Sequence, residues 1–160
     1  MIFVTVGHQM PFDRLVRVVD DWAGRSGRHD LFGQIGRTEY RPRHFSVAAH
    51  VSPQEFMMRM REATGVVAHA GTGTIIAAMQ LGKPLLVLPR LSVLGETRND
   101  HQIPTAKHFA SAGHILAAFD ESELLSKIDA LERFRPRATI DSQAAPELIA
   151  RIRAFVFQGG

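Results

Sequence analysis

Cysteine is absent from this sequence of 160 residues, which excludes disulfide bonds and thiolate metal ligands. Long apolar runs are absent as well, since no stretch approaches the about 20 residues that a membrane-spanning helix needs. The apolar run at residues 2–4 is short and lacks the basic leader of a secretory signal peptide. We therefore expect a cytoplasmic protein, and its length predicts a single domain over residues 1–160.

A strong excess of one charge is also missing. The net charge is +3 and the isoelectric point about 9.9, with the arginines spread along the chain instead of clustered. This balance indicates a nucleic-acid partner only weakly. A basic face toward anionic ligands or a membrane surface fits the composition equally well.

Short apolar stretches alternate with segments of helical periodicity. Strands are predicted at residues 2–6, 31–35, 45–51, 65–68, 85–88 and 114–119. Helices are predicted at residues 12–22, 53–62, 100–112, 121–134 and 146–157, with another between the fourth and fifth strands that ends at Gly82. This alternation predicts an α/β fold, a Rossmann-like open parallel sheet with helices on both faces. Ligands of such sheets bind outside the carboxyl ends of the strands, which here precede the loops after Val6, Ala68 and Pro89.

The stretch HAGTGT, residues 69–74, joins the fourth strand to the next helix. Two glycines there let the backbone approach an anion, and the N–H groups of a helix N-terminus together with threonine hydroxyls are donors for a phosphate. A tight turn capped by a threonine explains the same residues equally well. The stretch is not a dinucleotide fingerprint, because Ile76 takes the place of the third glycine, and no Gly-Lys-Ser or Gly-Lys-Thr of a Walker loop follows.

Two longer stretches carry a family resemblance. HAGTGTIIAAMQLGKPLLVLPR, followed by GETRNDHQIPTAKHFASAGHI, resembles the donor-binding half of GT-B glycosyltransferases, the family 28-type C-terminal domain. The opening FVTVGHQMPFDRLV resembles small single-domain members. These are donor-binding subunits such as those of dolichol-linked chitobiose synthase and of bacterial exopolysaccharide and capsule transferases. The resemblance covers about residues 1–130.

The resemblance implies roles for the matching positions. The donor diphosphate would be bound by Gly71, Thr72, Gly73 and Thr74. Gly7 and His8 would face the same crevice. His69 would touch phosphate or sugar, or else be buried and hydrogen-bonded to the backbone. The sugar hydroxyls would be bound by the group Asn99, Asp100, His101 and Gln102. Ser52 and Pro53 would lie near the uracil. Many relatives bind the ribose with a glutamate where this chain has Ala77, so Glu96 is the expected substitute.

Several other residues have a structural and a functional interpretation. Arg90 and Arg98 are expected to be solvated or, less often, to bind an acidic sugar or a lipid-linked diphosphate. His101 and His108 could share a helix face, but no third ligand is evident, so no metal site is expected. The methionines at 57, 58 and 60 are expected to pack in the core or in an interface.

The resemblance implies the donor-binding subunit of a two-component glycosyltransferase. It would move a sugar from a UDP-sugar, without a further cofactor, to a lipid-linked acceptor in surface polysaccharide biosynthesis. A membrane-associated acceptor-binding subunit would be its partner and would hold it at the inner face of the cell membrane. The partner would also supply the general base, for which His8 is the local alternative. Two other functions stay open, a non-catalytic sugar-nucleotide-binding or regulatory module and a UDP-sugar epimerase-like protein.

Overall fold

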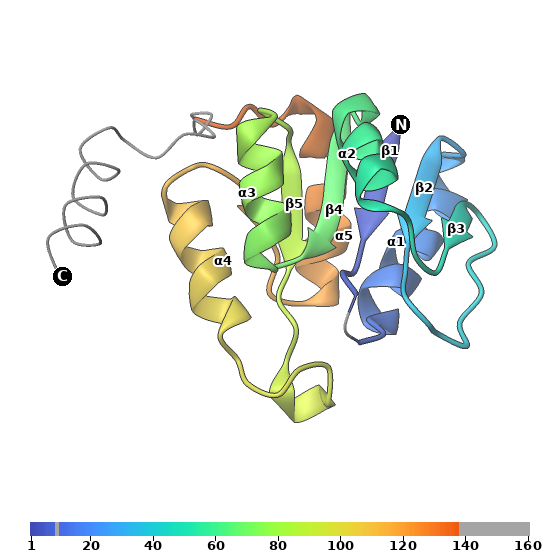
Figure 1. Cartoon of the computed structure of the whole chain (residues 1–160), viewed down its shortest axis with the longest axis horizontal. Helices are drawn as coiled ribbons and strands as arrows, with labels where there is room; N and C mark the ends of the chain where they lie inside the picture. Colours follow the sequence, from blue (N-terminus) through green and yellow to red (C-terminus); the bar gives the residue numbers. More distant parts are fainter. Residues whose placement is uncertain (9, 138–160) are drawn as a thin grey trace, which may run out of the picture.

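A computed structural model describes residues 1–8 and 10–137 of the chain. Strands and helices alternate along it (Figure 1). The strands are β1 (Ile2–Thr5), β2 (Leu31–Gln34), β3 (Ser46–Ala48), β4 (Gly65–His69), β5 (Leu85–Leu88) and β6 (Leu116–Ala117). The helices are α1 (Asp13–Ser26), α2 (Pro53–Glu62), α3 (Thr72–Gln80), α4 (Gln102–Ser111) and α5 (Glu121–Ile128), with the short 3-10 turns η1 (Ser92–Leu94) and η2 (Leu131–Arg133). The predicted helix at residues 146–157 lies outside the described residues.

The six strands form one parallel sheet in the order β3-β2-β1-β4-β5-β6. The chain builds outward from β1 to β3, returns to the other side of β1 with β4, and continues to β6. The strand order therefore reverses between β1 and β4, and a crevice opens there at the carboxyl ends of the strands. The predicted Rossmann-like parallel sheet is confirmed.

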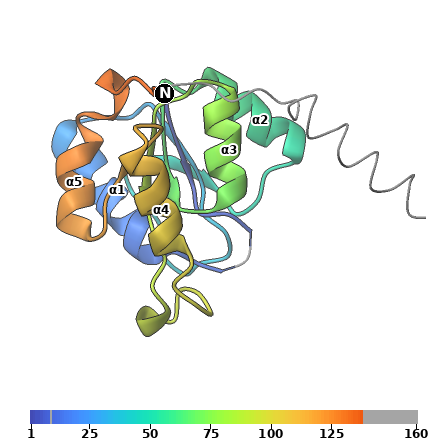
Figure 2. The same ribbon diagram turned by 90° about the vertical axis from the view of Figure 1, so that its left-hand side faces the viewer.

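Helices cover both faces of the sheet, as Figure 2 shows. Alternate side chains of β1 enter different cores: Ile2 and Val4 pack with residues of α1 and α5, whereas Phe3 packs with residues of α2, α3 and α4. Strands covered on both faces are apolar at nearly every position, which is why the sequence shows short continuous apolar runs instead of alternation.

The element boundaries differ from the predictions where turn chemistry intervenes. Helix α1 continues to Ser26 because the residue after it, Gly27, closes it in the left-handed region with φ 65°. The predicted helix at 121–134 ends at Ile128, and a separate turn, η2, follows. The third strand, predicted over 45–51, spans only Ser46–Ala48, and the predicted sixth strand shortens to Leu116–Ala117. Both lie at the sheet edges, where a neighbour on one side alone supports pairing.

None of the helices within residues 1–8 and 10–137 combines the length and apolar character that a membrane crossing requires.

Candidate functional site

A cleft of about 970 Å³ opens at the carboxyl edge of the sheet, where the strand order reverses. Loops after β1, β3, β4 and β5 form its walls. Most of the residues predicted from the sequence line it, namely Gly7, His8, His69, Gly71, Gly73, Thr74, Glu96, Asn99, His101 and Gln102. Thr72 and Asp100 do not line it, and neither does Ser52, although its neighbour Pro53 does.

Helix α3 begins at the cleft. Gly71 is its N-cap residue in an extended conformation, and no side chain caps the helix. Thr72 is therefore the first helical residue, and the alternative of a threonine cap is wrong. The first N–H groups of any helix lack partners within that helix, and the helix dipole adds a partial positive charge at this end. The first turn of α3 thus presents free amides and the Thr74 side chain to the cleft, which is a favourable arrangement for an anion.

The three glycines around the cleft have different functions. A Cβ at Gly71 would collide with Nε2 of His69, and a Cβ at Gly7 would lie 2.8 Å from Cε1 of the same ring. These two glycines make room for the His69 side chain, and Gly7 also has a positive φ of 78°. A Cβ at Gly73, by contrast, would meet nothing within 4 Å. The space above Gly73 therefore belongs to the open cleft and is available to a ligand.

His69 is held as a neutral imidazole. Burial, together with the positive charge of Arg90, lowers its pKa to about 4. Its Nδ1 is buried and has no hydrogen-bond partner among the described residues. At neutral pH the ring is therefore an uncharged group beside the helix terminus, and it adds no positive charge to an anion site.

Arg90 is buried, so the expectation of a solvated side chain is wrong, while binding of an acidic ligand stays a prediction. Only 4% of the residue is exposed. Its guanidinium donates hydrogen bonds to four backbone carbonyls: those of Val6, Met10 and Pro11 in the loop after β1, and that of Glu96. The same guanidinium lies over the Phe12 ring, 4.7 Å from its centroid. Arg90 thus ties the two loops that face each other across the reversal in strand order.

Two buried glutamines fix the neighbouring walls. The side-chain amide of Gln34 donates to the carbonyls of Gly7 and Ala49, and its oxygen accepts from Thr5. The side-chain oxygen of Gln102 accepts the backbone N–H of Arg90 at 3.1 Å. Sequence reasoning missed Gln34, although a polar residue that ends an apolar strand at the carboxyl edge is a signal for it.

The two acidic residues of the loop after β5 are both engaged by the protein. The Glu96 carboxylate accepts two hydrogen bonds from Arg14, at 2.8 and 2.9 Å, and one from the backbone N–H of Leu91. The Asp100 carboxylate accepts from the backbone N–H and the hydroxyl of Ser92. These bonds shape the loop. They also leave Glu96 with few lone pairs for a ribose, so its assignment as the ribose-binding residue stays a prediction with little geometric support.

An apolar shelf lies at one end of the cleft. It consists of Val51, Pro53, Phe56 and Met57, from the start of α2 and the segment before it. Ser52 caps this helix by accepting the N–H of Glu55, so its hydroxyl is engaged there. Met57 was expected to pack in the core or an interface, but it contributes to the shelf. An apolar surface of this kind suits the face of a nucleobase.

Within the described part of the chain, no group of three His, Asp or Glu side chains is placed to hold a metal ion. The absence of a metal from the reaction stays a prediction.

Comparison with known proteins places this cleft in context. The curated relatives include the UDP-N-acetylglucosamine transferase subunit ALG13 of Candida glabrata, 29% identical over 94 residues that cover 58% of this chain and 44% of that protein. The protein of the same name from Yarrowia lipolytica is 25% identical over 147 residues, covering 84% of this chain and 72% of that protein. The chain thus spans less than half of the first of these relatives.

Solved structures share the fold. A solution structure of ALG13 has a TM-score of 0.62 at 20% identity and covers 94% of this chain and 93% of that one. The UDP-GlcNAc 2-epimerase of Methanocaldococcus jannaschii, solved with UDP-GlcNAc and UDP, has a TM-score of 0.64 at 11% identity, and the match covers 96% of this chain but 45% of that one. Fold similarity therefore does not separate transferases from epimerases.

The family is shown by sequence. The profile of the glycosyltransferase family 28 C-terminal domain matches residues 1–152, nearly the whole chain. The chain therefore belongs to the glycosyltransferase family 28 C-terminal domain family.

Proposed function

We propose that this chain is the donor-binding subunit of a two-component glycosyltransferase that transfers a sugar from a UDP-sugar to a lipid-linked acceptor. Family membership supports a role in glycosyl transfer. The relatives named as UDP-N-acetylglucosamine transferase subunits make UDP-N-acetylglucosamine the first donor to test. The observation that carries the proposal is the uncapped N-terminus of α3, which opens through Gly73 into the cleft.

In this proposal each wall of the cleft binds a different part of the donor. The diphosphate lies against the amides of the first turn of α3, with the hydroxyl of Thr74 as a further donor. The uracil lies on the apolar shelf, and Asn99, His101 and Gln102 at the opposite wall bind sugar hydroxyls. The backbone N–H of Arg90 occupies the side-chain oxygen of Gln102, whereas its Nε2 makes no hydrogen bond with the described residues and donates to a sugar hydroxyl in this proposal.

Catalysis follows from where charge develops. When the bond from the sugar to the diphosphate breaks, negative charge accumulates on the leaving UDP. Amides and a helix dipole that already point at the diphosphate stabilise that charge without reorganising. The described site therefore favours departure of UDP, and activation of the acceptor hydroxyl is a separate requirement.

No free carboxylate on the described cleft wall of this chain can serve as the general base. Among the described lining residues Glu96 alone is acidic, and Arg14 holds it. His8 is exposed in the cleft and its ring lies 6.0 Å from that of His50, centroid to centroid. We propose that the partner subunit supplies the base, with His8 as the alternative. The lack of a free carboxylate pair also disfavours an epimerase.

We further propose that the partner binds the acceptor and is associated with the membrane, that surface polysaccharide assembly is the pathway, and that the protein works on the cytoplasmic side. The subunit names of the relatives support a partner. No metal and no cofactor besides the donor is required in this proposal, because the helix terminus balances the diphosphate charge.

Thermal unfolding of the purified chain with UDP tests the donor site. At about 100 times its dissociation constant UDP should stabilise the fold by about 2.7 kcal/mol, whereas NADH should not. Gly73→Ala fills the open space above the helix terminus without touching another residue, so without ligand this variant should melt no lower than the natural chain, and it should lose the response to UDP. An unchanged response in Gly73→Ala would refute the assignment of the diphosphate to this turn.

A further inference from the structure

Turn η1 and its flanking residues 91–96 form a projection that we call the apolar tip. Figures 1 and 2 both show η1 extending beyond the carboxyl edge of the sheet, at the end of the loop that follows β5. Its side chains Val93 and Leu94 are 85% and 55% exposed. No other large hydrophobic side chain among residues 1–8 and 10–137 exceeds 44%. The two most exposed apolar groups thus lie together on the segment that projects farthest beside the cleft.

Hydrogen bonds hold the apolar tip in one conformation. Gly95 ends η1 in the left-handed region, φ 69°, and its N–H donates to the carbonyl of Ser92. The carboxylate of Glu96 binds the N–H of Leu91, and that of Asp100 binds both the N–H and the hydroxyl of Ser92. These hydrogen bonds hold the backbone of η1 in a conformation that exposes Val93 and Leu94 before any binding partner is present.

The carboxyl edge that carries the apolar tip also carries basic side chains without an ion pair among the described residues. The charge of Glu96 is paired with Arg14, which also contacts Glu121, whereas Asp100 accepts hydrogen bonds from Ser92 and keeps its negative charge. Arg98, in the same loop, is exposed and makes no ion pair with the described residues. Arg37, which follows β2 at the same edge of the sheet, is likewise exposed and without an ion pair there.

The size of the apolar tip distinguishes a lipid surface from a protein partner. A specific protein interface needs about 800 Å² on each partner, with a broad complementary patch around its anchors. Two side chains on a narrow turn do not provide this. A bilayer needs only a few apolar groups that reach about 5–10 Å into the headgroup region, together with basic residues that contact lipid phosphates.

We propose that the apolar tip inserts into the surface of an anionic lipid bilayer. Val93 and Leu94 enter the boundary between headgroups and acyl chains, and Arg37 and Arg98 contact lipid phosphates. With one small apolar group and few cations the attachment is weak and reversible, and it brings the cleft close to the membrane. This contact is the chain's own and does not depend on a partner subunit or on the proposed sugar transfer.

Flotation with vesicles tests the contact. The whole chain should float with vesicles of equal parts phosphatidylcholine and phosphatidylglycerol at low salt, and not with phosphatidylcholine alone. Val93→Asp combined with Leu94→Asp should lower the bound fraction about tenfold or more, because charged groups replace the inserting side chains. Arg37→Glu should weaken binding to the mixed vesicles and reduce its dependence on salt.

Matched variants away from the projection serve as controls. Met58 on α2 is 44% exposed and does not line the cleft, so Met58→Asp should float like the natural chain. Arg25 lies in the last turn of α1, at the opposite edge of the sheet, and Arg25→Glu controls for net charge. Because Val93 and Leu94 do not line the cleft, their double variant should keep the UDP-induced rise in melting temperature.

Site-specific labelling gives a second readout, since the chain contains no cysteine. An environment-sensitive dye on Val93→Cys should shift its emission to the blue with mixed vesicles, while the same dye on Met58→Cys should not respond. The proposal is overturned if the natural chain does not bind mixed vesicles at low salt. It is also overturned if the Val93 and Leu94 double variant binds them as well as the natural chain does.

Discussion

Arg90 joins the loops that follow β1 and β5, because its guanidinium donates to four backbone carbonyls from a nearly buried position. Arg90→Met keeps most of the side-chain volume but removes every donor. The buried carbonyls then lack partners, and the free energy of unfolding should fall by about 3 kcal/mol. Urea unfolding measures this loss.

Arg98→Met is the control for this change, since Arg98 is exposed in the same loop. It should alter the free energy of unfolding by no more than about 0.5 kcal/mol. Arg90→Met should also raise the pKa of His69 from about 4, because a nearby positive charge is removed, while burial keeps that pKa below its ordinary value. Equal losses in the free energy of unfolding in Arg90→Met and Arg98→Met would contradict the role of Arg90 in linking the two loops.

At the scale of elements, the two glycines between β4 and the first turn of α3 differ in the space that is available for a side chain. Gly71→Ala places a Cβ against the His69 ring, so the ring or the turn must move, and stability should fall by about 1–3 kcal/mol. Gly73→Ala meets open space and removes the flexibility of a helical glycine, so stability should be unchanged or rise by up to about 1 kcal/mol. Chemical unfolding measures the free energy of unfolding of both variants. If Gly73→Ala lowers it as much as Gly71→Ala does, the two glycines do not differ in this way.

Sequence patterns could predict the elements that dominate the core. The apolar run at Leu85–Leu88 gives β5 without error, and Pro53 correctly opens α2 after the Ser52 cap. Their signals are local, since periodicity and capping depend on neighbouring residues. The strands at the sheet edges were predicted too long because pairing, not composition, sets where they end.

The site was predictable as a set of loops but not as a set of contacts. The reversal in strand order implies that HAGTGT and the loop after β5 meet, and the cleft confirms that they do. The distant pairs of Arg14 with Glu96 and of Arg90 with the β1 loop are invisible to local patterns. Arg90 therefore looked like a solvated residue in the sequence, and Glu96 looked free.

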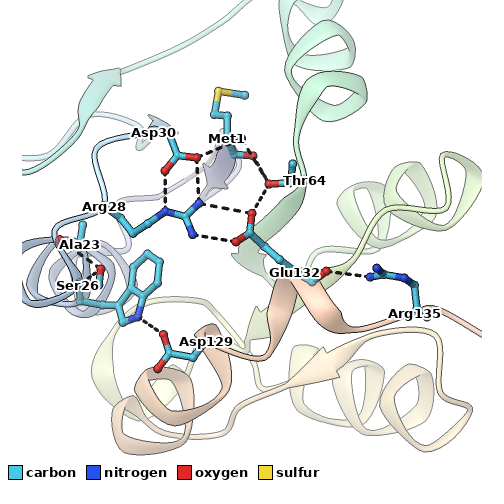
Figure 3. A network of polar contacts seen from close by, with 10 residues as sticks. Met1, Ala23, Ser26, Arg28, Asp30, Thr64, Asp129, Glu132 and Arg135 are labelled. Carbon is cyan, nitrogen blue, oxygen red and sulfur yellow. Dashed lines mark hydrogen bonds and ion pairs between the residues drawn. The ribbon is translucent and has the colours of Figure 1, made fainter.

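At the scale of the whole molecule, the amino edge of the sheet carries a polar network opposite the cleft (Figure 3). Arg28 binds both Asp30 and Glu132, and so connects the segment before β2 to η2 near the end of the described chain. The Thr64 hydroxyl donates to Glu132, and the Thr64 backbone N–H donates to the carbonyl of Met1. The network connects the segments at the amino edge of the sheet, where no ligand is expected. The candidate site lies at the carboxyl edge.

Because of this network, the free energy of unfolding depends on pH in the acidic range. Hydrogen bonds from Arg28 lower the pKa of Asp30 to about 2, and hydrogen bonds from Arg28 and Thr64 lower that of Glu132. A carboxyl whose folded pKa is depressed stabilises the fold above its unfolded pKa and loses that contribution as the pH falls through the folded value. For Asp30 the loss should run from about pH 4 to about pH 2.

Arg28→Met tests the network, because it removes the partner of both carboxylates. At neutral pH the variant should be less stable by under about 1 kcal/mol, since Asp30 and Glu132 are partly exposed and solvent screens the pairs. The gap between the natural chain and the variant should shrink as the pH falls toward about 2. Urea unfolding over this pH range measures the gap, and a gap that stays constant would contradict the assignment.

The most direct measurement for the central claim is the change in backbone amide chemical shifts of the ¹⁵N-labelled chain on addition of UDP. A diphosphate at the N-terminus of α3 should give the largest changes at Thr72, Gly73 and Thr74, with smaller ones at Gly7. Gly73→Ala should suppress them. Unchanged shifts of these amides at saturating UDP, or largest changes at the opposite edge of the sheet around Asp30, would contradict a diphosphate site at α3.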